Sequence, residues 1–243
     1  MMTSLLANWP APPHVRALTT TRTEGHSLPP FDKNNLAFHV GDHPHSVAAN
    51  RQALVTSLQL KSEPIWLSQI HSNICIIVEE DSEREADAAV TRRKDIPLAI
   101  MTADCLPIVL CDTKGQEVSA IHAGWRGLAN GIVENTLAKM KSHRESLMAW
   151  IGPGICQKCY EVGTEVIQTY KDRYPFTAST FQDRGEKQYA NLAKMAELIL
   201  KNNGVKAVYQ SEVCSFEDKN AFYSYRREAE TGRMTTLIWF TDL

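Results

Sequence analysis

Two histidines and a cysteine stand where three strand-like segments end. His71 ends PIWLSQIH, Cys105 follows PLAIMTA, and His122 stands at the end of EVSAIHA. Because the ends of neighbouring strands converge on one edge of a sheet, where loops form a cleft, these side chains can meet there. Two imidazoles and a thiolate suit zinc, and three protein ligands leave a fourth position for water or substrate, as in catalytic zinc sites. The alternative is three ordinary half-buried residues, since ligands so far apart in sequence have no local signature.

The same atoms could instead serve a cysteine nucleophile. Cys105 would act as the thiolate, with His122 or His71 as its base. A nucleophile needs only one of the two histidines as a base, and the other would have no role or would be an oxyanion donor. Metal binding uses both histidines.

Asp104, beside Cys105, could orient a metal ligand or act as an acid or base. As a surface turn residue it would do neither. Adjacent residues of a strand point to opposite faces, so Asp104 and Cys105 reach one cleft only if the chain turns there. Pro107 favours such a turn, because a proline restricts the residue before it and favours the end of regular structure.

The segment HAGWRG, residues 122–127, carries an arginine between two glycines at a strand-to-helix turn. Backbone N–H groups and the positive end of the helix dipole favour an anion at such a turn. The planar guanidinium of Arg126 suits phosphate or carboxylate. The alternative is a tight turn in which Gly124 and Gly127 only allow close packing and Arg126 is solvated.

The remaining cysteines and histidines point less clearly to a site. CQKC, residues 156–159, is a Cys-x-x-Cys, but no second pair with knuckle spacing accompanies it, so we expect no functional dithiol. Three cysteines fall inside strand-like runs and are expected to be small buried hydrophobes: Cys75, Cys111 and Cys214. HVGDHPH could form a second metal locus, but the preferred interpretation is an exposed loop cluster of His39, His43 and His45.

Composition indicates a globular protein without a one-sided charge. The chain has 243 residues, 43% of them hydrophobic, and a formal charge of -2 from 26 basic and 28 acidic residues. No strongly basic block is present, so a nucleic-acid face is not indicated. No secretory signal and no apolar stretch of about 18 residues is found. We therefore expect a cytoplasmic protein that binds neither nucleic acid nor membrane, with a single domain over residues 1–243.

Strands and helices that would position these residues alternate irregularly. Strands are predicted by runs rich in β-branched and aromatic residues: PIWLSQIH, ICIIVE, PLAIMTA, LPIVLCD, EVSAIHA, LMAWIG, AVYQSEV and MTTLIWF. Apolar spacing predicts a helix from Leu128 to Met140, and weaker helices at about 46–59 with Ser46 as N-cap, about 161–172, and about 189–202 with Gly204 as C-cap. Strand pairs such as 64–71 and 74–79 are joined too tightly for a parallel crossover. The expected class is α/β or α+β with mixed sheets.

Several motifs resemble, in order and in spacing, the bacterial YfiH family over nearly the whole chain. The motifs are QIHS, ADAAVT, TADCLP, HAGWRG, IGPGI, CYEVG and FYSYRREAETGRM. Members of this family are also called laccase-domain proteins, purine nucleoside phosphorylases or peptidoglycan editing factors. The resemblance implies a four-layer α/β/β/α fold with mixed sheets and a zinc ion at the positions of His71, Cys105 and His122. One departure is RTEGHS, where Glu24 replaces the usual glycine although Arg22 and Ser27 match.

The resemblance implies phosphorolysis of adenosine, inosine and methylthioadenosine, together with adenosine deamination and an older polyphenol oxidase label. A blue-copper laccase needs about four copper ions and on the order of ten mostly imidazole ligands. The chain has only eight histidines, which disfavours a blue-copper laccase mechanism. That leaves oxidation of phenols by a single bound copper as a side reaction. Deamination suits a three-ligand zinc, which lowers the pKa of its water to about 7, with Asp104 as the assisting acid.

Phosphorolysis needs an anion site near the ribose, for which the candidates are Arg22, Arg126, Arg226 and Arg227. Gln69 and Asn35 could hydrogen-bond the base or the ribose, or serve the backbone as turn residues. The hypothesis is therefore a zinc-dependent purine nucleoside phosphorylase with adenosine deaminase activity, acting on a nucleoside and phosphate. The alternatives are a cysteine hydrolase that edits cell-wall precursors, a copper-dependent polyphenol oxidase, and a non-enzymatic partner protein that holds the metal structurally.

Overall fold

The computed structural model describes residues 3–242, whose strands form three sheets. The five-stranded sheet has the order β1-β2-β14-β6-β3, comprising Ser4–Leu6, Val15–Thr20, Met234–Phe240, Leu98–Thr102 and Ile65–Trp66. The six-stranded sheet has the order β13-β9-β7-β8-β5-β4, comprising Ala207–Gln210, Leu147–Ile151, Leu106–Asp112, Val118–Ala123, Ala88–Thr91 and Cys75–Ile77. The small antiparallel sheet β10-β12-β11 comprises Glu161–Val162, Lys187–Ala190 and Phe181–Arg184. Both large sheets contain parallel and antiparallel pairs, so the mixed α/β class is confirmed.

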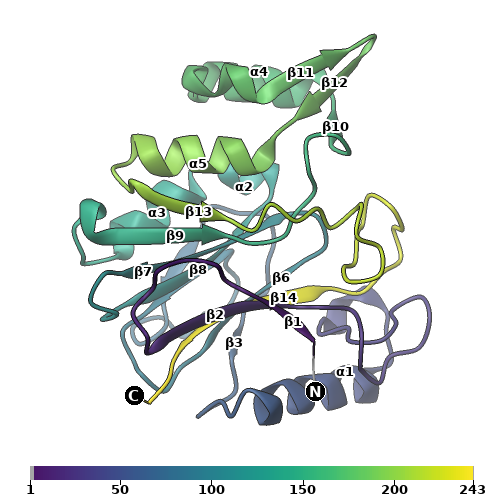
Figure 1. The fold of residues 1–243 in the computed structure, drawn as a ribbon, viewed down its shortest axis with the longest axis vertical. Coiled ribbons are helices and arrows are strands. Elements are labelled where there is room, and N and C mark those ends of the chain that lie inside the picture. The colour runs from purple at the N-terminus through teal and green to yellow at the C-terminus, as the bar shows by residue number, and fades with distance from the viewer. Residues whose placement is uncertain (1–2, 243) are drawn as a thin grey trace.

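The sheets and helices lie in layers (Figure 1), and three of the apolar clusters lie between these layers. One lies between the two large sheets, where Trp150 of β9 and Ile238 of β14 belong to the same cluster. A second lies on the outer face of the six-stranded sheet, against α2, α3, α4 and α5, which are Trp125–Ala129, Ile132–Lys139, Thr164–Arg173 and Leu192–Asn202. A third joins the outer face of the five-stranded sheet to α1, Pro44–Ser57. The six-stranded sheet is thus covered on both faces, which explains why β7 and β8 are buried along their whole length.

The apolar stripe from Leu128 to Met140 is divided between two helices. α2 ends at Ala129 and α3 begins at Ile132. Gly131 between them has a φ of 92°, a left-handed conformation that interrupts a helix and that glycine adopts readily. The prediction of one continuous helix is therefore wrong, although the apolar residues of the stripe are buried.

The other predicted helices are present with shifted ends. α1 begins at Pro44 and its N-cap is His43, so the prediction of Ser46 as N-cap is wrong. Proline suits the first helical turn because the N–H that it lacks would have no partner there. The C-cap of α5 is Asn203, so the prediction of Gly204 as C-cap is wrong by one residue. Gly204 follows with a φ of 91°, the left-handed conformation that is common just after a helix. No helix in the described part of the chain is long and apolar enough to cross a membrane.

The segment before the first predicted metal ligand differs from the expectation. β3 is confined to Ile65–Trp66, and it lies in a different sheet from β4, so the predicted strand pair 64–71 and 74–79 is wrong. His71 therefore lies in a loop rather than at a strand end, with a φ of 60°. Six further strands were not predicted from the sequence: β1, β2, β5, β10, β11 and β12. Such short strands, several of them rich in alanine, threonine or charged residues, give a weak strand signal.

Glu24, at the position where the resemblance expects a glycine, has a backbone conformation that glycine adopts readily. Its φ is 54°, in the left-handed region that favours glycine. The backbone at this position would therefore also suit a glycine.

Candidate active site

His71, Cys105 and His122 come together although they are far apart in sequence. Their ligand atoms all lie within 4.8 Å of one another. The Sγ of Cys105 is 3.9 Å from Nε2 of His71, and the two imidazole rings meet edge to face with centroids 4.7 Å apart. His71 is exposed, Cys105 is half-buried and His122 is buried, so the cluster can be reached from solvent on the His71 side.

Each of the three side chains comes from a different local structure. Cys105 lies at the turn between β6 and β7, where Asp104 has a φ of 92°. The predicted turn is therefore present, but Pro107 lies inside β7 instead of ending a strand. His122 lies in β8, directly opposite Pro107. This pairing brings the turn that carries Cys105 next to the strand that carries His122.

The two glycines of HAGWRG allow the loops to approach. A Cβ at Gly124 would lie 3.0 Å from the Sγ of Cys105 and 3.0 Å from Cδ2 of His71. A Cβ at Gly127 would lie 2.9 Å from the carbonyl oxygen of Ser72. A larger residue at either position would push against the cluster or the loop beside it, so both glycines serve close packing.

Asp87, which was not predicted as a site residue, is hydrogen-bonded to two of the three clustered residues, His122 and His71. Its carboxylate accepts hydrogen bonds from Nδ1 of His122 at 2.7 Å, from the backbone N–H of His71 at 3.0 Å, and from the backbone and hydroxyl of Ser72 at 2.6 and 2.7 Å. Burial alone would raise the pKa of Asp87, but the bonds from His122 and Ser72 lower it to about 2. The signal in the sequence was an acidic residue beside the apolar strand of ADAAVT, since a buried carboxylate needs partners.

Cys105 and His122 shift each other's protonation. Burial alone would raise the pKa of the Cys105 thiol, but the charges and hydrogen bonds of His122 and His71 lower it. Burial alone would lower the pKa of His122, but the Cys105 thiolate and the Asp87 carboxylate raise it. Without a metal ion, these shifts favour Cys105 as the thiolate and His122 as the imidazolium.

The donor set fits a divalent ion such as zinc. Asp87 occupies Nδ1 of His122, which leaves Nε2 of that ring as the nitrogen available to a metal. Two imidazoles and one thiolate with an accessible side match a catalytic zinc site. Copper accepts the same donors, so the ligands do not identify the metal.

A cavity of about 360 Å³ opens onto the three ligands. It is also lined by His39, Gln69, Met101, Arg126, Tyr225 and Arg233. Arg126 was predicted at the site, and it lines the cavity. Arg233 also lines it but was not predicted, although it is part of the motif FYSYRREAETGRM. The cavity therefore combines the three candidate metal ligands, two guanidinium groups and apolar surface.

Asp104 does not line this cavity. Its carboxylate accepts hydrogen bonds from the hydroxyls of Ser215 at 2.7 Å and Ser224 at 3.0 Å, and from the backbone N–H of Arg226 at 2.7 Å. With a φ of 92°, the residue turns the chain so that Cys105 is among the cavity-lining residues and Asp104 is not. These hydrogen bonds fix the turn beside Cys105, which agrees with the orienting role considered from the sequence, and the acid–base role of Asp104 stays a prediction.

Most of the residues expected to bind substrate lie outside the cavity. The Arg22 side chain donates to the backbone and carboxylate of Asp32, and the Arg227 side chain donates to the backbone of residues 215, 216 and 222. Arg226 donates to the carbonyl of Glu161. Asn35 is fully buried and its amide holds the backbone of residues 37 and 233. These contacts serve the fold of neighbouring loops.

Gln69 lines the cavity, but both ends of its amide are used. Its Nε2 donates to the carbonyl of Met101 at 2.8 Å and its Oε1 accepts from the N–H of Met101 at 2.8 Å. The side chain therefore fixes the loop that leads to His71 against the end of β6. This is the backbone role that the sequence analysis gave as the alternative.

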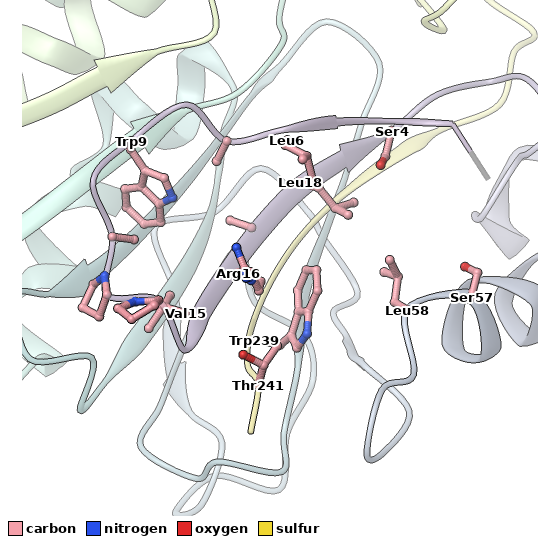
Figure 2. Close-up of a pocket in the computed structure, with 15 residues that line it drawn as sticks. Ser4, Leu6, Trp9, Val15, Arg16, Leu18, Ser57, Leu58, Trp239 and Thr241 are labelled. Carbon is pink, nitrogen blue, oxygen red and sulfur yellow. The ribbon is translucent and has the colours of Figure 1, made fainter. Parts of the chain in front are cut away.

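A larger cavity, of about 500 Å³, carries none of this chemistry (Figure 2). It lies where the N-terminal segment with Trp9 passes the ends of β2 and β14, near Leu58 at the end of α1. Among the described residues that line it, Arg16 alone carries a charged side chain. The smaller cavity beside the three ligands is therefore the better candidate for catalysis.

Comparison with known proteins matches the chain along nearly its whole length. The model of a family described as multi-copper polyphenol oxidoreductase laccase matches residues 16–241. Purine nucleoside phosphorylase YfiH of Escherichia coli is 38% identical over 237 residues, which cover 97% of this chain and 98% of that protein. A purine nucleoside phosphorylase of Pseudomonas aeruginosa is 40% identical over 242 residues, covering 98% of each chain.

Solved structures share the fold. A Neisseria meningitidis protein of known crystal structure is 40% identical, with a TM-score of 0.94 over 98% of this chain and 99% of that chain. The crystal structure of Bacillus licheniformis YfiH is 27% identical, with a TM-score of 0.86 over 93% of each chain.

Proposed function

The chain belongs to the multi-copper polyphenol oxidoreductase laccase family, and from this premise we propose that it is a zinc-dependent purine nucleoside phosphorylase. Its substrates are phosphate and adenosine, inosine or methylthioadenosine, and adenosine deamination is a second activity at the same site. The observation that carries the proposal is one cavity in which three metal ligands lie beside Arg126 and Arg233.

We assign phosphate binding to Arg126 and Arg233. Nη1 of Arg233 donates to the carbonyls of Thr231 and Gly232, and the guanidinium of Arg126 lies 4.4 Å from the ring centroid of Trp125. Held in this way, the two guanidinium groups lose little freedom when an anion binds between them. Arg22, Arg226 and Arg227 are engaged elsewhere and take no part in this assignment.

Purine binding falls to the other side chains of the cavity. Met101 and Tyr225 provide apolar surface for a planar base. Burial, followed by the charges of Arg233 and Arg51, lowers the pKa of His39, so its imidazole is neutral at pH 7 and offers one donor and one acceptor. A volume of about 360 Å³ is within the range of small-molecule sites.

In phosphorolysis a phosphate oxygen attacks C1′ of the ribose, and the bond from C1′ to the purine breaks with its electron pair leaving on the base. Arg126 and Arg233 hold the attacking phosphate against the ribose, so the reaction gains from proximity and from charge stabilisation. A divalent ion held by His71, Cys105 and His122 would supply Lewis-acid chemistry, which would polarise the purine as a leaving group in phosphorolysis and would activate water for deamination. Asp87 and Gly124 keep the three ligands in place without touching the substrate.

The test is an incubation of the pure protein with adenosine and phosphate, with and without a chelator. The expected products are adenine and ribose 1-phosphate, with inosine from deamination, and their formation stops when the metal is removed. Arg126→Ala and Arg233→Ala lower kcat/KM for phosphorolysis by about 10²-fold, whereas Arg226→Ala, a matched control outside the cavity, leaves it within about twofold. Absence of all three products from zinc-loaded protein contradicts the proposal.

A second candidate function is that of a cysteine hydrolase, for example one that edits cell-wall precursors. It is favoured by the chain of contacts from Cys105 to His122 to Asp87, which has the order of a nucleophile, a base and an orienting acid. Zinc and this mechanism compete for the same thiolate. If zinc protects Cys105 from iodoacetamide and phosphorolysis requires zinc, the hydrolase is ruled out.

A further inference from the structure

A second cluster of metal-ligating side chains lies outside the cavity. Cys156, Cys159, Cys214 and Glu217 each offer one ligand atom, and these four atoms all lie within 4.8 Å of one another. Cys156 and Cys159 are half-buried, Cys214 is buried and Glu217 is exposed. The Cys-x-x-Cys therefore has a partner, which is a single cysteine 58 residues after Cys156 instead of a second pair.

The separations of these atoms match those around a tetrahedral ion. Sγ of Cys156 is 3.7 Å from Sγ of Cys159 and 3.5 Å from Oε2 of Glu217. Zinc with sulfur ligands at about 2.3 Å in a tetrahedron holds neighbouring sulfurs about 3.8 Å apart. A disulfide would require about 2.05 Å between the sulfurs. The separation of Cys156 and Cys159 is therefore that of two thiolates around one ion, and Sγ of Cys214 lies within 4.8 Å of both.

The backbone holds the two contributing segments side by side. The N–H groups of Cys159 and Tyr160 donate to the carbonyl of Cys156, which closes a turn between the first two cysteines. The N–H of Ser215 donates to the carbonyl of Gly154 at 3.0 Å, next to an isolated bridge between Gly154 and Cys214. The N–H of Cys156 also donates to Sγ of Cys214 at 3.3 Å, a contact that stabilises a metal-bound thiolate.

We propose that Cys156, Cys159, Cys214 and Glu217 form a second metal site that binds zinc with four protein ligands. Three thiolates select zinc over magnesium or calcium, which prefer oxygen. Four protein ligands complete a tetrahedron and leave no position for substrate, so the ion has a structural role.

The second site is connected to the candidate active site through one residue. Ser215, which follows Cys214, donates its hydroxyl to the carboxylate of Asp104, and Asp104 precedes Cys105. The ion therefore holds the segment that fixes the turn carrying the active-site thiolate. Its loss lowers stability first and active-site metal affinity second.

The test uses cobalt(II) as the probe in the full-length Cys105→Ser variant. This variant lacks the active-site sulfur, so any sulfur-to-cobalt charge-transfer absorption comes from the second site and is independent of the proposed enzyme activity. One equivalent of cobalt is expected to give this absorption together with the d–d bands of a tetrahedral ion. Adding Cys159→Ser is expected to abolish both, while adding Cys75→Ser, a control cysteine outside both clusters, leaves them unchanged.

Glu217→Gln in the Cys105→Ser background is a milder second variant, since Glu217 is exposed and its loss leaves the fold intact. It is expected to bind cobalt at least about tenfold more weakly and to shift the d–d bands, because a charged ligand is lost. The absence of sulfur–cobalt absorption from reduced Cys105→Ser protein overturns the proposal. A Cys156–Cys159 disulfide in protein alkylated at lysis also overturns it.

Discussion

The carboxylate of Asp87 accepts one hydrogen bond from the imidazole of His122 and another from the backbone N–H of His71. Asp87→Asn keeps the size of the side chain but removes the charge and one acceptor. We expect the affinity of the centre for zinc to fall 10–100-fold, as for other residues that orient metal-bound histidines. Competition with a chromophoric zinc chelator measures this change.

Asp112→Asn is the matched control for Asp87→Asn. Asp112 is also buried and accepts backbone hydrogen bonds, from Lys114, Gln116 and Glu117 in the turn after β7. Its replacement is expected to reduce stability without changing zinc affinity. An equal loss of zinc affinity in both variants would show that Asp87 acts only through general stability.

The chemistry of single residues was predictable where it depends on side-chain type. Two imidazoles and a thiol after separate apolar runs were enough to propose the three ligands. The roles of Asp87 and Arg233 were not predictable, because they depend on which loops meet in space. The partners of Asp104 were not predictable either, because its left-handed backbone and the positions of Ser215 and Ser224 depend on the folded chain.

At the scale of elements, the turn between β6 and β7 depends on Asp104. Its carboxylate joins this turn to the segments at Ser215 and Ser224. Asp104→Asn tolerates the same backbone conformation but leaves a buried partner unsatisfied, so we expect a loss of about 1–3 kcal/mol in the free energy of unfolding. Urea denaturation checks this value, and an unchanged midpoint would contradict the role given to Asp104.

Helix α5 carries two ion pairs, from Lys194 and Lys201 to Glu197, whose contribution to stability depends on pH. Burial alone would raise the pKa of Glu197, but hydrogen bonds from Lys201 and Lys194 lower it. Because the folded pKa lies below the unfolded value of 4.5, the stabilisation is present above pH 4.5 and is lost as the pH falls through the folded pKa. Glu197→Gln is expected to cost about 0.5–1 kcal/mol at pH 7.

The pH series for Glu197→Gln is measured by urea denaturation at pH 7, 5 and 3. The difference from the wild-type chain should be constant at the two higher values and smaller at the lowest. A difference that grows as the pH falls would contradict the assignment of these ion pairs.

Long apolar elements were predictable and short ones were not. β7, β8, β9 and β14 are buried along their length, and their runs of branched and aromatic residues gave their positions closely. The break at Gly131 was hidden because the apolar spacing continues across it. β3 was predicted too long, because the loop that follows it, toward His71, still contains apolar residues.

At the scale of the molecule, we propose that the described chain unfolds as one unit. β2 and β14, from opposite ends of the sequence, are paired in the five-stranded sheet, which shares a core with the six-stranded sheet. We expect tryptophan fluorescence and far-ultraviolet circular dichroism to report the same single transition in urea. Two separated transitions would show independent units.

The central claim is that a metal at His71, Cys105 and His122 and the two cavity arginines form one phosphorolytic site. The most direct measurement is the initial rate of ribose 1-phosphate formation as metal-free protein is titrated with zinc, in the wild-type chain and in His71→Ala. The wild-type rate is expected to rise with zinc and to level off once the three-ligand site is filled, while His71→Ala stays inactive at the same zinc content. Full phosphorolysis by the metal-free protein, or by His71→Ala, would contradict it.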